Sequence, residues 1–171
     1  RIKTGKSASV FQPTISILGG NTAENFNTAF PPEILGQGFF SRMLLIHGDR
    51  SDRLITFPEK PSDAAKASLV SKLTALRQLH GAVSMAQDAA STLDAIYRGW
   101  KDLPDSRFIS YSNRRFTHLL KLCVILAAEE SITTPGAPIV LSKSTVIRAN
   151  TFLCAAEFLM PRALGEFGSS K

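Results

Sequence analysis

The sequence predicts an α/β protein in which two to three strands come first and a mostly helical region follows. Before residue 58, two stretches rich in apolar and β-branched residues lie next to glycines, a pattern typical of buried strands. After Pro58, apolar residues recur at intervals of three and four, which indicates helices. The length of 171 residues, of which 44% are hydrophobic, is sufficient for a folded core. We therefore expect two parts, residues 1–58 with strands and loops and residues 59–171 with helices.

The first part contains the predicted strands. Residues 14–18 (Thr-Ile-Ser-Ile-Leu) alternate in polarity and stop at two glycines, and residues 39–47 form a second apolar stretch. Between them, Thr22 is a suitable N-cap for a short helix that ends at Pro31. Residues 54–57 are expected to form a third, short strand.

The second part is expected to contain four helices, at residues 62–79, 88–103, 112–130 and 142–161. Ser62 and Ser142 are suitable N-caps for the first and the last of these helices. A short extended piece, residues 139–141, precedes the last helix, which we expect to kink or end at Pro161.

Charge and cysteine content restrict the classes of function. The 20 Lys and Arg residues against 14 Asp and Glu give a net charge of +6, which favours a polyanionic partner, although many basic domains bind no nucleic acid. The longest apolar run, residues 122–128, is too short for a membrane span of about 18 residues, so no membrane partner is predicted. Cys123 and Cys154 lie in apolar helical patterns, which predicts buried, unpaired thiols in a reducing compartment. The histidines have no cysteine or carboxylate at ligand spacing, so no metal site is predicted.

The tripeptide Gly5-Lys6-Ser7 matches the end of a phosphate-binding P-loop, but its surroundings do not fit. A P-loop needs an earlier glycine, a preceding strand and a following helix whose amides face the phosphates. The earlier glycine would fall before residue 1, and residues 10–13 form a poor helix because they include valine and proline. We therefore reject this motif as a nucleotide site.

Two polar residues, Asn21 and Thr22, follow the first predicted strand. In open α/β sheets, ligands bind beyond the carboxyl ends of strands, where either side chain would orient water or a phosphate oxygen. The alternative is an ordinary glycine turn with Thr22 as the helix N-cap, and spacing alone somewhat favours it.

A glycine-containing loop, residues 36–42, delivers Arg42 beside aromatic residues at the start of the second predicted strand. An arginine in that position must be paired or must face a ligand, because an unpaired buried guanidinium is costly. It suits an arginine finger, a planar charged fork that stabilises a transferring phosphoryl group. A salt bridge to Glu33 or Asp49 explains the same residue equally well.

The predicted helix over residues 112–130 carries Arg114, His118 and Lys121 at intervals of four and three, which places them on one basic stripe opposite the apolar face. Arg107 and Arg115 add charge nearby. The stripe is a candidate contact line for nucleic-acid phosphates. The alternative, which the pattern favours slightly, is the solvated face of an amphipathic helix.

Two stretches taken together resemble a known family. Residues 13–26 (PTISILGGNTAENF) and 35–46 (LGQGFFSRMLLI) are similar to the distal half of the RecA-like ATPase domain in phage, prophage and plasmid replicative helicase/primase proteins. Residues 115–128 and 146–150 resemble the helical C-terminal region of the same proteins.

The resemblance implies the distal part of a RecA-like sheet, with Asn21 and Thr22 in a sensor role and Arg42 as a finger that reaches a neighbouring subunit's nucleotide. The family's P-loop and acidic strand would lie upstream of residue 1. ATP and Mg²⁺ are therefore expected in the full-length assembly alone, and no cofactor is expected for this chain by itself. The chain is then a C-terminal fragment or a separate domain of a helicase-like ATPase.

The function implied is that of the C-terminal portion of an ATP-dependent DNA replication helicase or primase-helicase in the cytoplasm of a bacterial host. Its expected partners are DNA, single-stranded in particular, and neighbouring copies in a ring-like oligomer. The alternatives are a non-catalytic DNA-binding or initiator module and an oligomerisation domain of a phage protein. A P-loop upstream in the full-length gene would favour the motor.

Overall fold

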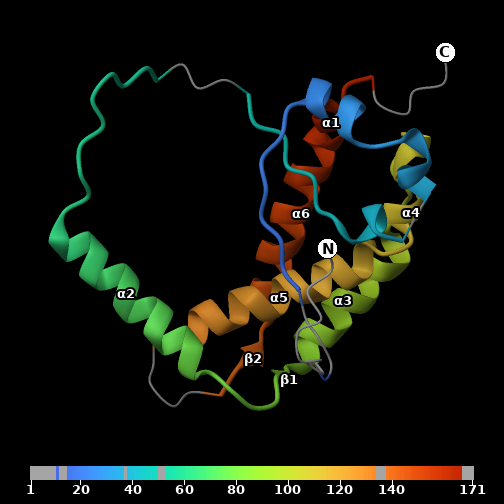
Figure 1. The fold of residues 1–171 in the computed structure, drawn as a ribbon. Coiled ribbons are helices and arrows are strands. Elements are labelled where there is room, and N and C mark those ends of the chain that lie inside the picture. Colours follow the sequence, from blue (N-terminus) through green and yellow to red (C-terminus); the bar gives the residue numbers. More distant parts are fainter. Residues whose placement is uncertain (1–10, 12–14, 37, 50–52, 134–137, 167–171) are drawn as a thin grey trace.

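The computed structural model describes residues 11, 15–36, 38–49, 53–133 and 138–166. Over these residues the protein is mostly helical and contains a small parallel sheet of two strands (Figure 1). In chain order the elements are α1 (Ala23–Ala29), the 3-10 helices η1 (Pro32–Gly36) and η2 (Phe40–Arg42), α2 (Asp63–Gln78), β1 (Ser84–Met85), α3 (Gln87–Gly99), the 3-10 helix η3 (Ser106–Phe108), α4 (Ile109–Ser112), α5 (Arg115–Ser131), β2 (Val140–Leu141) and α6 (Lys143–Leu164). The Gly5-Lys6-Ser7 tripeptide, which the sequence analysis rejects as a P-loop, lies outside the described residues.

The main core forms where α6 packs against α5 and α3. Along α6, apolar side chains recur at helical spacing, and Val146, Ala149 and Leu153 are fully buried. They meet Leu119 and Cys123 of α5, which are equally buried. The predicted apolar character of the helices around residues 112–130 and 142–161 is therefore what holds this part together.

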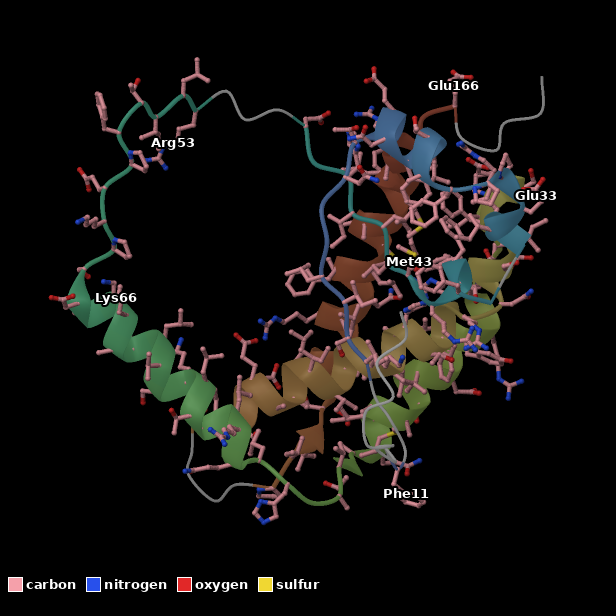
Figure 2. All side chains as sticks on the ribbon, in the orientation of Figure 1. Phe11, Glu33, Met43, Arg53, Lys66 and Glu166 are labelled. Atoms are coloured by element: carbon pink, nitrogen blue, oxygen red, sulfur yellow. The ribbon has the colours of Figure 1, made fainter. Side chains whose placement is uncertain are left out.

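A second apolar cluster joins the N-terminal segment to the far end of α6. Phe26 of α1 and Phe40 of η2 pack with Phe108, Met160 and Leu164. Figure 2 shows the Met43 side chain beside this group, and Figure 1 shows α1 next to the end of α6. Residues from both predicted parts of the chain therefore share one core.

The sheet is not where the sequence predicts it. β1 and β2 pair in parallel, Ser84 with Val140 and Met85 with Leu141, and both strands belong to the second part of the chain. Residues 139–141 are thus correctly predicted as extended. Within the described part of residues 1–58 there is no strand, and residues 15–18 and 54–57 are exposed.

The strand predictions for residues 39–47, for residues 54–57 and for 15–18, the described part of residues 14–18, are therefore wrong for this structure, and the reason is the lack of a partner. A β-pattern becomes a strand when a neighbouring strand accepts and donates its backbone hydrogen bonds, and no described segment lies in that position. The predicted second strand starts instead with the 3-10 turn η2, whose Ser41 side chain donates to the Gly38 carbonyl at 3.0 Å.

The predicted N-caps Ser62 and Ser142 are confirmed. The Ser62 hydroxyl accepts from the Ala65 amide at 3.2 Å, and the Ser142 hydroxyl accepts from the Thr145 amide at 3.1 Å. Three features differ from the prediction: α3 stops at Gly99, the third predicted helix is divided into α4 and α5, and α6 does not end at Pro161, which was one of the two outcomes expected there besides a kink. Burial of Met160 and Leu164 on either side of Pro161 explains why that helix does not end there.

Helix α2 stands apart from the helical core in Figure 1. Its apolar residues Leu69, Leu73 and Leu76 lie at helical spacing on one face, but no residue of this helix is buried. The helix is therefore held by its N-cap and its backbone hydrogen bonds rather than by packing on the core.

Candidate functional site

Arg42 closes the 3-10 helix η2, and its side chain is exposed. Its guanidinium Nη1 donates to the carbonyl oxygen of Gly38. No described carboxylate lies within ion-pair distance of it. The alternative salt bridge is not formed, because Asp49 instead lies 3.1 Å from His47 Nε2 and 3.9 Å from Arg162 Nη1. The structure therefore leaves the Arg42 fork open to an external anion, at an exposed turn rather than at the edge of a sheet.

Asn21 and Thr22 are both exposed and lie at the N-terminus of α1. The Thr22 hydroxyl accepts from the Asn25 amide at 3.2 Å, and the Asn21 side-chain oxygen accepts from the Thr22 amide at 2.9 Å. Thr22 is thus the N-cap, as one of the two interpretations of the sequence predicts. The described chain contains no strand before these residues, so they do not sit at a strand end.

The five basic residues predicted to face nucleic acid do not form one surface. Arg107 is held by Asp105, with 2.7 Å between Nη2 and Oδ2, and donates to the Gly165 carbonyl at 2.7 Å. His118 is buried, and its Nε2 lies 3.0 Å from the Ser41 carbonyl oxygen. Arg115 is buried as well.

The predicted basic stripe of Arg114, His118 and Lys121 is therefore wrong for His118, and the nearby Arg115 adds no charge to a solvent-facing surface. Both residues lie within α5: Arg115 shares the buried face of Leu119 and Leu126, and His118 faces the Ser41 carbonyl, so neither side chain points to the solvent. Arg114 is half-buried and Lys121 is exposed, and neither forms an ion pair with a described residue.

Arg115 and Glu157 form the most buried ion pair in the described structure. Both side chains are 3% exposed, and Arg115 Nε lies 2.9 Å from Glu157 Oε1. Arg115 Nη2 donates to Glu157 Oε2 at 3.2 Å and to Asn150 at 2.9 Å, while the Tyr111 hydroxyl donates to Glu157 at 2.8 Å. Such a pair is stable when its remaining lone pairs and protons are also satisfied, as they largely are here.

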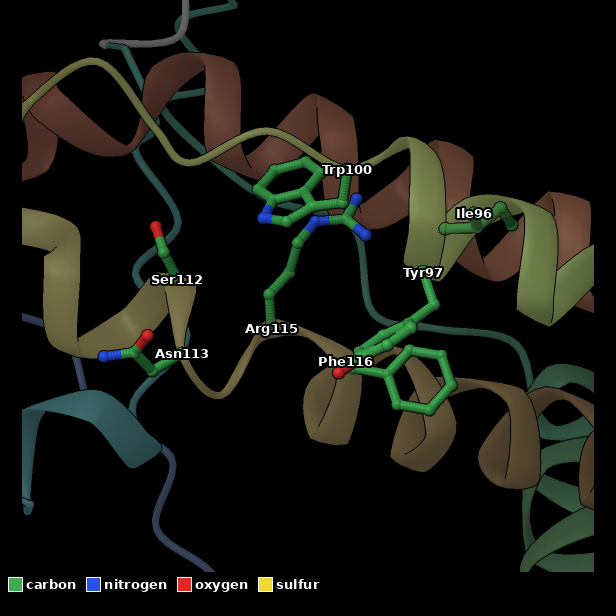
Figure 3. Close-up of a pocket in the computed structure, with 7 residues that line it drawn as sticks. All are labelled: Ile96, Tyr97, Trp100, Ser112, Asn113, Arg115 and Phe116. Atoms are coloured by element: carbon green, nitrogen blue, oxygen red, sulfur yellow. The ribbon is translucent and has the colours of Figure 1, made fainter.

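The Arg115 guanidinium also forms one wall of a cavity of about 280 Å³ between the end of α3 and the α4–α5 junction (Figure 3). It stacks over the Trp100 ring with 3.6 Å between Cζ and the ring centroid. Tyr97 and Phe116 lie edge to face on another wall, with ring centroids 4.9 Å apart. The cavity therefore combines aromatic surfaces with a fixed cation.

The pKa values of Tyr111, Asp105 and Cys123 are shifted by burial or by a neighbouring charge. Burial, and secondarily the Glu157 carboxylate, raise the pKa of Tyr111 well above its usual range, and the protonated hydroxyl donates to Glu157. The Arg107 guanidinium lowers the pKa of Asp105, and burial raises the pKa of the Cys123 thiol. The prediction of a buried Cys123 is confirmed, whereas Cys154 is exposed and the same prediction is wrong for it.

The sequence analysis missed Glu157 and the cavity residues as site candidates. The one available signal was an acidic residue at 157 inside an otherwise apolar helical pattern, because a carboxylate on the buried face of a helix requires a partner. Nothing local identifies that partner as Arg115, which lies 42 positions earlier in the chain.

Comparison of the chain with protein-family models, with curated proteins and with solved structures finds no match. In the described part of the chain, no three His, Cys, Asp or Glu side chains gather in a way that would hold a metal ion. Over the same residues, every helix is too short or too polar to cross a bilayer.

Proposed function

We propose that this chain is the C-terminal portion of an ATP-dependent DNA replication helicase or primase-helicase, in which Arg42 acts as an arginine finger. The observation that carries the proposal is the state of Arg42: exposed, next to a buried aromatic anchor, Phe40, and without a carboxylate partner among the described residues. A finger must be free to meet phosphate oxygens of a nucleotide on another subunit, and a guanidinium is suited to that role because it is always charged and planar.

The extended segments supply a second line of support. Ile15 and Ile17 are 81% and 79% exposed, which is costly for apolar residues, while residues 43–45 pack partly buried against the two cores. Strands of a parallel sheet are covered on both faces and paired at both edges. The proposal assigns these segments to the distal strands of a RecA-like sheet whose other strands belong to a longer protein.

The other roles follow from the proposal. Asn21 and Thr22 serve as sensor residues near the nucleotide, and ATP with Mg²⁺ is bound by a P-loop and an acidic strand elsewhere in the longer protein. The neighbouring copies form a ring, and Arg114 and Lys121 remain available for DNA phosphates. The host compartment is the bacterial cytoplasm.

The test uses the protein encoded by the complete gene. Arg42→Ala should leave nucleotide binding nearly unchanged and lower the ATPase turnover by about a thousandfold or more. Arg77→Ala, which removes an exposed arginine of α2, is the matched control and should keep full turnover. Mixing Arg42→Ala subunits with P-loop variant subunits should restore part of the activity, because the finger acts across an interface.

Equal turnover of the Arg42→Ala and Arg77→Ala proteins would overturn the finger assignment. A complete gene without a P-loop would overturn the motor itself. In that case the second candidate, a non-catalytic DNA-binding module, is favoured by the net charge of +6 and by the unpaired Arg114 and Lys121 of the helical part.

A further inference from the structure

We propose that the cavity between α3 and the α4–α5 junction is a pocket for one unpaired nucleobase of single-stranded DNA. The inference deepens the proposed function and rests on it for the choice of DNA as the nucleic acid. Its chemical basis is separate from Arg42 and lies in the residues that line the cavity: Ile96, Tyr97, Trp100, Ser112, Asn113, Arg115 and Phe116.

The cavity offers a stacking surface. Tyr97 is 63% exposed although it is aromatic, and its ring is fixed by an edge-to-face contact with Phe116. A nucleobase presents a flat π-face whatever its sequence, and proteins that bind single strands use exposed aromatic rings for this contact. The volume of about 280 Å³ is of the size that one base and part of its sugar require.

The polar wall supplies donors that are already fixed. Glu157 and Asn150 engage Nε and Nη2 of Arg115, whereas Nη1 has no hydrogen-bond partner among the described residues. The indole Nε1 of Trp100 is also unpartnered, but it is fully buried, so a ligand in the cavity does not reach it unless a side chain moves; Figure 3 shows it on the Ser112 side of the ring. Nη1 of Arg115 is therefore the fixed donor that the cavity presents to an acceptor.

A nucleobase matches these donors. The edges of unstacked bases carry carbonyl oxygens and ring nitrogens that accept from arginine and from side-chain amides such as that of Asn113. Because the buried ion pair already orients the Arg115 fork, binding a base costs little further side-chain entropy. A cavity that served packing alone would not need an arginine whose third nitrogen is left open.

Two cations flank the pocket along the chain and suit the adjoining phosphates. Lys101 directly follows Trp100 and is exposed, and Arg114 directly precedes Arg115 and is half-buried. Neither forms an ion pair within the described structure. The carboxylate of Asp94 forms its ion pair with Arg98, one helical turn later, at 2.8 Å, and not with Lys101 or Arg114.

The chain contains a single tryptophan, so Trp100 reports directly on the pocket. Titration of the purified chain with a thymidine 12-mer at low salt should change the Trp100 fluorescence and, with a labelled strand, raise the anisotropy at the same concentrations. An abasic 12-mer, which has the same phosphates and no bases, should bind at least fivefold more weakly.

Matched variants separate the pocket from general charge. Tyr97→Ala should weaken 12-mer binding about five- to a hundredfold, the range for loss of one stacked base. Phe152→Ala, which removes a comparably exposed aromatic ring of α6, should bind like the parent chain. Arg114→Ala should flatten the slope of log K against log salt by about 0.7, whereas Lys143→Ala should not. Circular dichroism confirms that each variant is folded.

The pocket proposal is overturned if the strand binds without a change in Trp100 fluorescence, if the abasic strand binds as tightly, or if Tyr97→Ala behaves like Phe152→Ala. Absence of any binding overturns it as well. None of these outcomes bears on whether Arg42 is an arginine finger. Conversely, an unchanged ATPase turnover in Arg42→Ala does not alter the result for the pocket. The two proposals can therefore be refuted separately.

Discussion

Replacing Glu157 by alanine should lower the free energy of unfolding by about 3–5 kcal/mol, because it leaves a buried guanidinium without its counter-charge. Both Glu157 and Arg115 are 3% exposed, so solvent would not compensate the loss. The substitution also removes the acceptor of the Tyr111 hydroxyl, 2.8 Å away, and an unsatisfied buried hydroxyl costs about 1–3 kcal/mol by itself. The two losses share one carboxylate and do not add in full, which places the effect near the upper end of the range.

Urea unfolding followed by circular dichroism measures this quantity. With a slope of about 2 kcal/mol per molar urea, a loss of about 5 kcal/mol moves the midpoint down by about 2.5 M. Glu157→Gln keeps an acceptor for Tyr111 and Arg115 and should show a smaller shift. Glu129→Ala is the control, because it breaks an exposed ion pair with Arg148, 2.9 Å in length, and should cost at most about 1 kcal/mol.

A loss below about 1 kcal/mol in Glu157→Ala would refute the reasoning, since it would mean that the Arg115 guanidinium is not desolvated. A double substitution of Arg115 and Glu157 to methionine provides the complementary measurement. It removes both charges together and should regain most of the stability lost in the single variant, as replacing a buried pair by apolar side chains is often neutral.

Two further predictions concern single groups. In the native protein, maleimide should label Cys154 rapidly and Cys123 slowly, because burial both shields the Cys123 thiol and raises its pKa. Cys154→Ser should abolish the rapid phase of labelling. Rapid labelling that persists in this variant would contradict the burial of Cys123. The Arg107 guanidinium lowers the pKa of Asp105 in the folded state, so this carboxylate adds stability above its unfolded pKa of about 3.9 and loses it as the pH falls through the folded value. Asp105→Asn should therefore flatten the loss of stability below about pH 4, and an unchanged acid limb in the urea midpoints would show that the pair adds nothing.

The helix starts could be predicted from the sequence because their causes are local. Ser62 and Ser142 each cap a helix by accepting from the amide three residues later, so both partners of the bond are neighbours in the sequence. The ends are harder, since tertiary packing decides them. Met160 and Leu164 are buried around Pro161, and this packing carries α6 past a residue that usually stops a helix.

The predictions of the strands and of the basic stripe were wrong for a different reason. Both features depend on contacts with residues that lie far away in the chain. Residues 15–18 have a strand pattern but no described neighbour to pair with, whereas residues 84–85, with little pattern of their own, pair with β2 some 55 positions later. Helical spacing puts Arg115 on the same face as the buried Leu119 and Leu126, but its carboxylate partner Glu157 lies on α6. Spacing along one element indicates which face is buried, but it does not identify the distant partner in either case.

The position of Arg115 connects the core of the molecule to the proposed pocket. Nε and Nη2 are engaged by Glu157, Asn150 and Cys154, and the flat face of the guanidinium covers Trp100. A guanidinium with these contacts cannot rotate away from the cavity without breaking the buried ion pair. The same contacts that make Arg115 important for folding therefore hold its remaining nitrogen in one orientation, and a donor that is rigid before the ligand arrives is what a selective pocket requires.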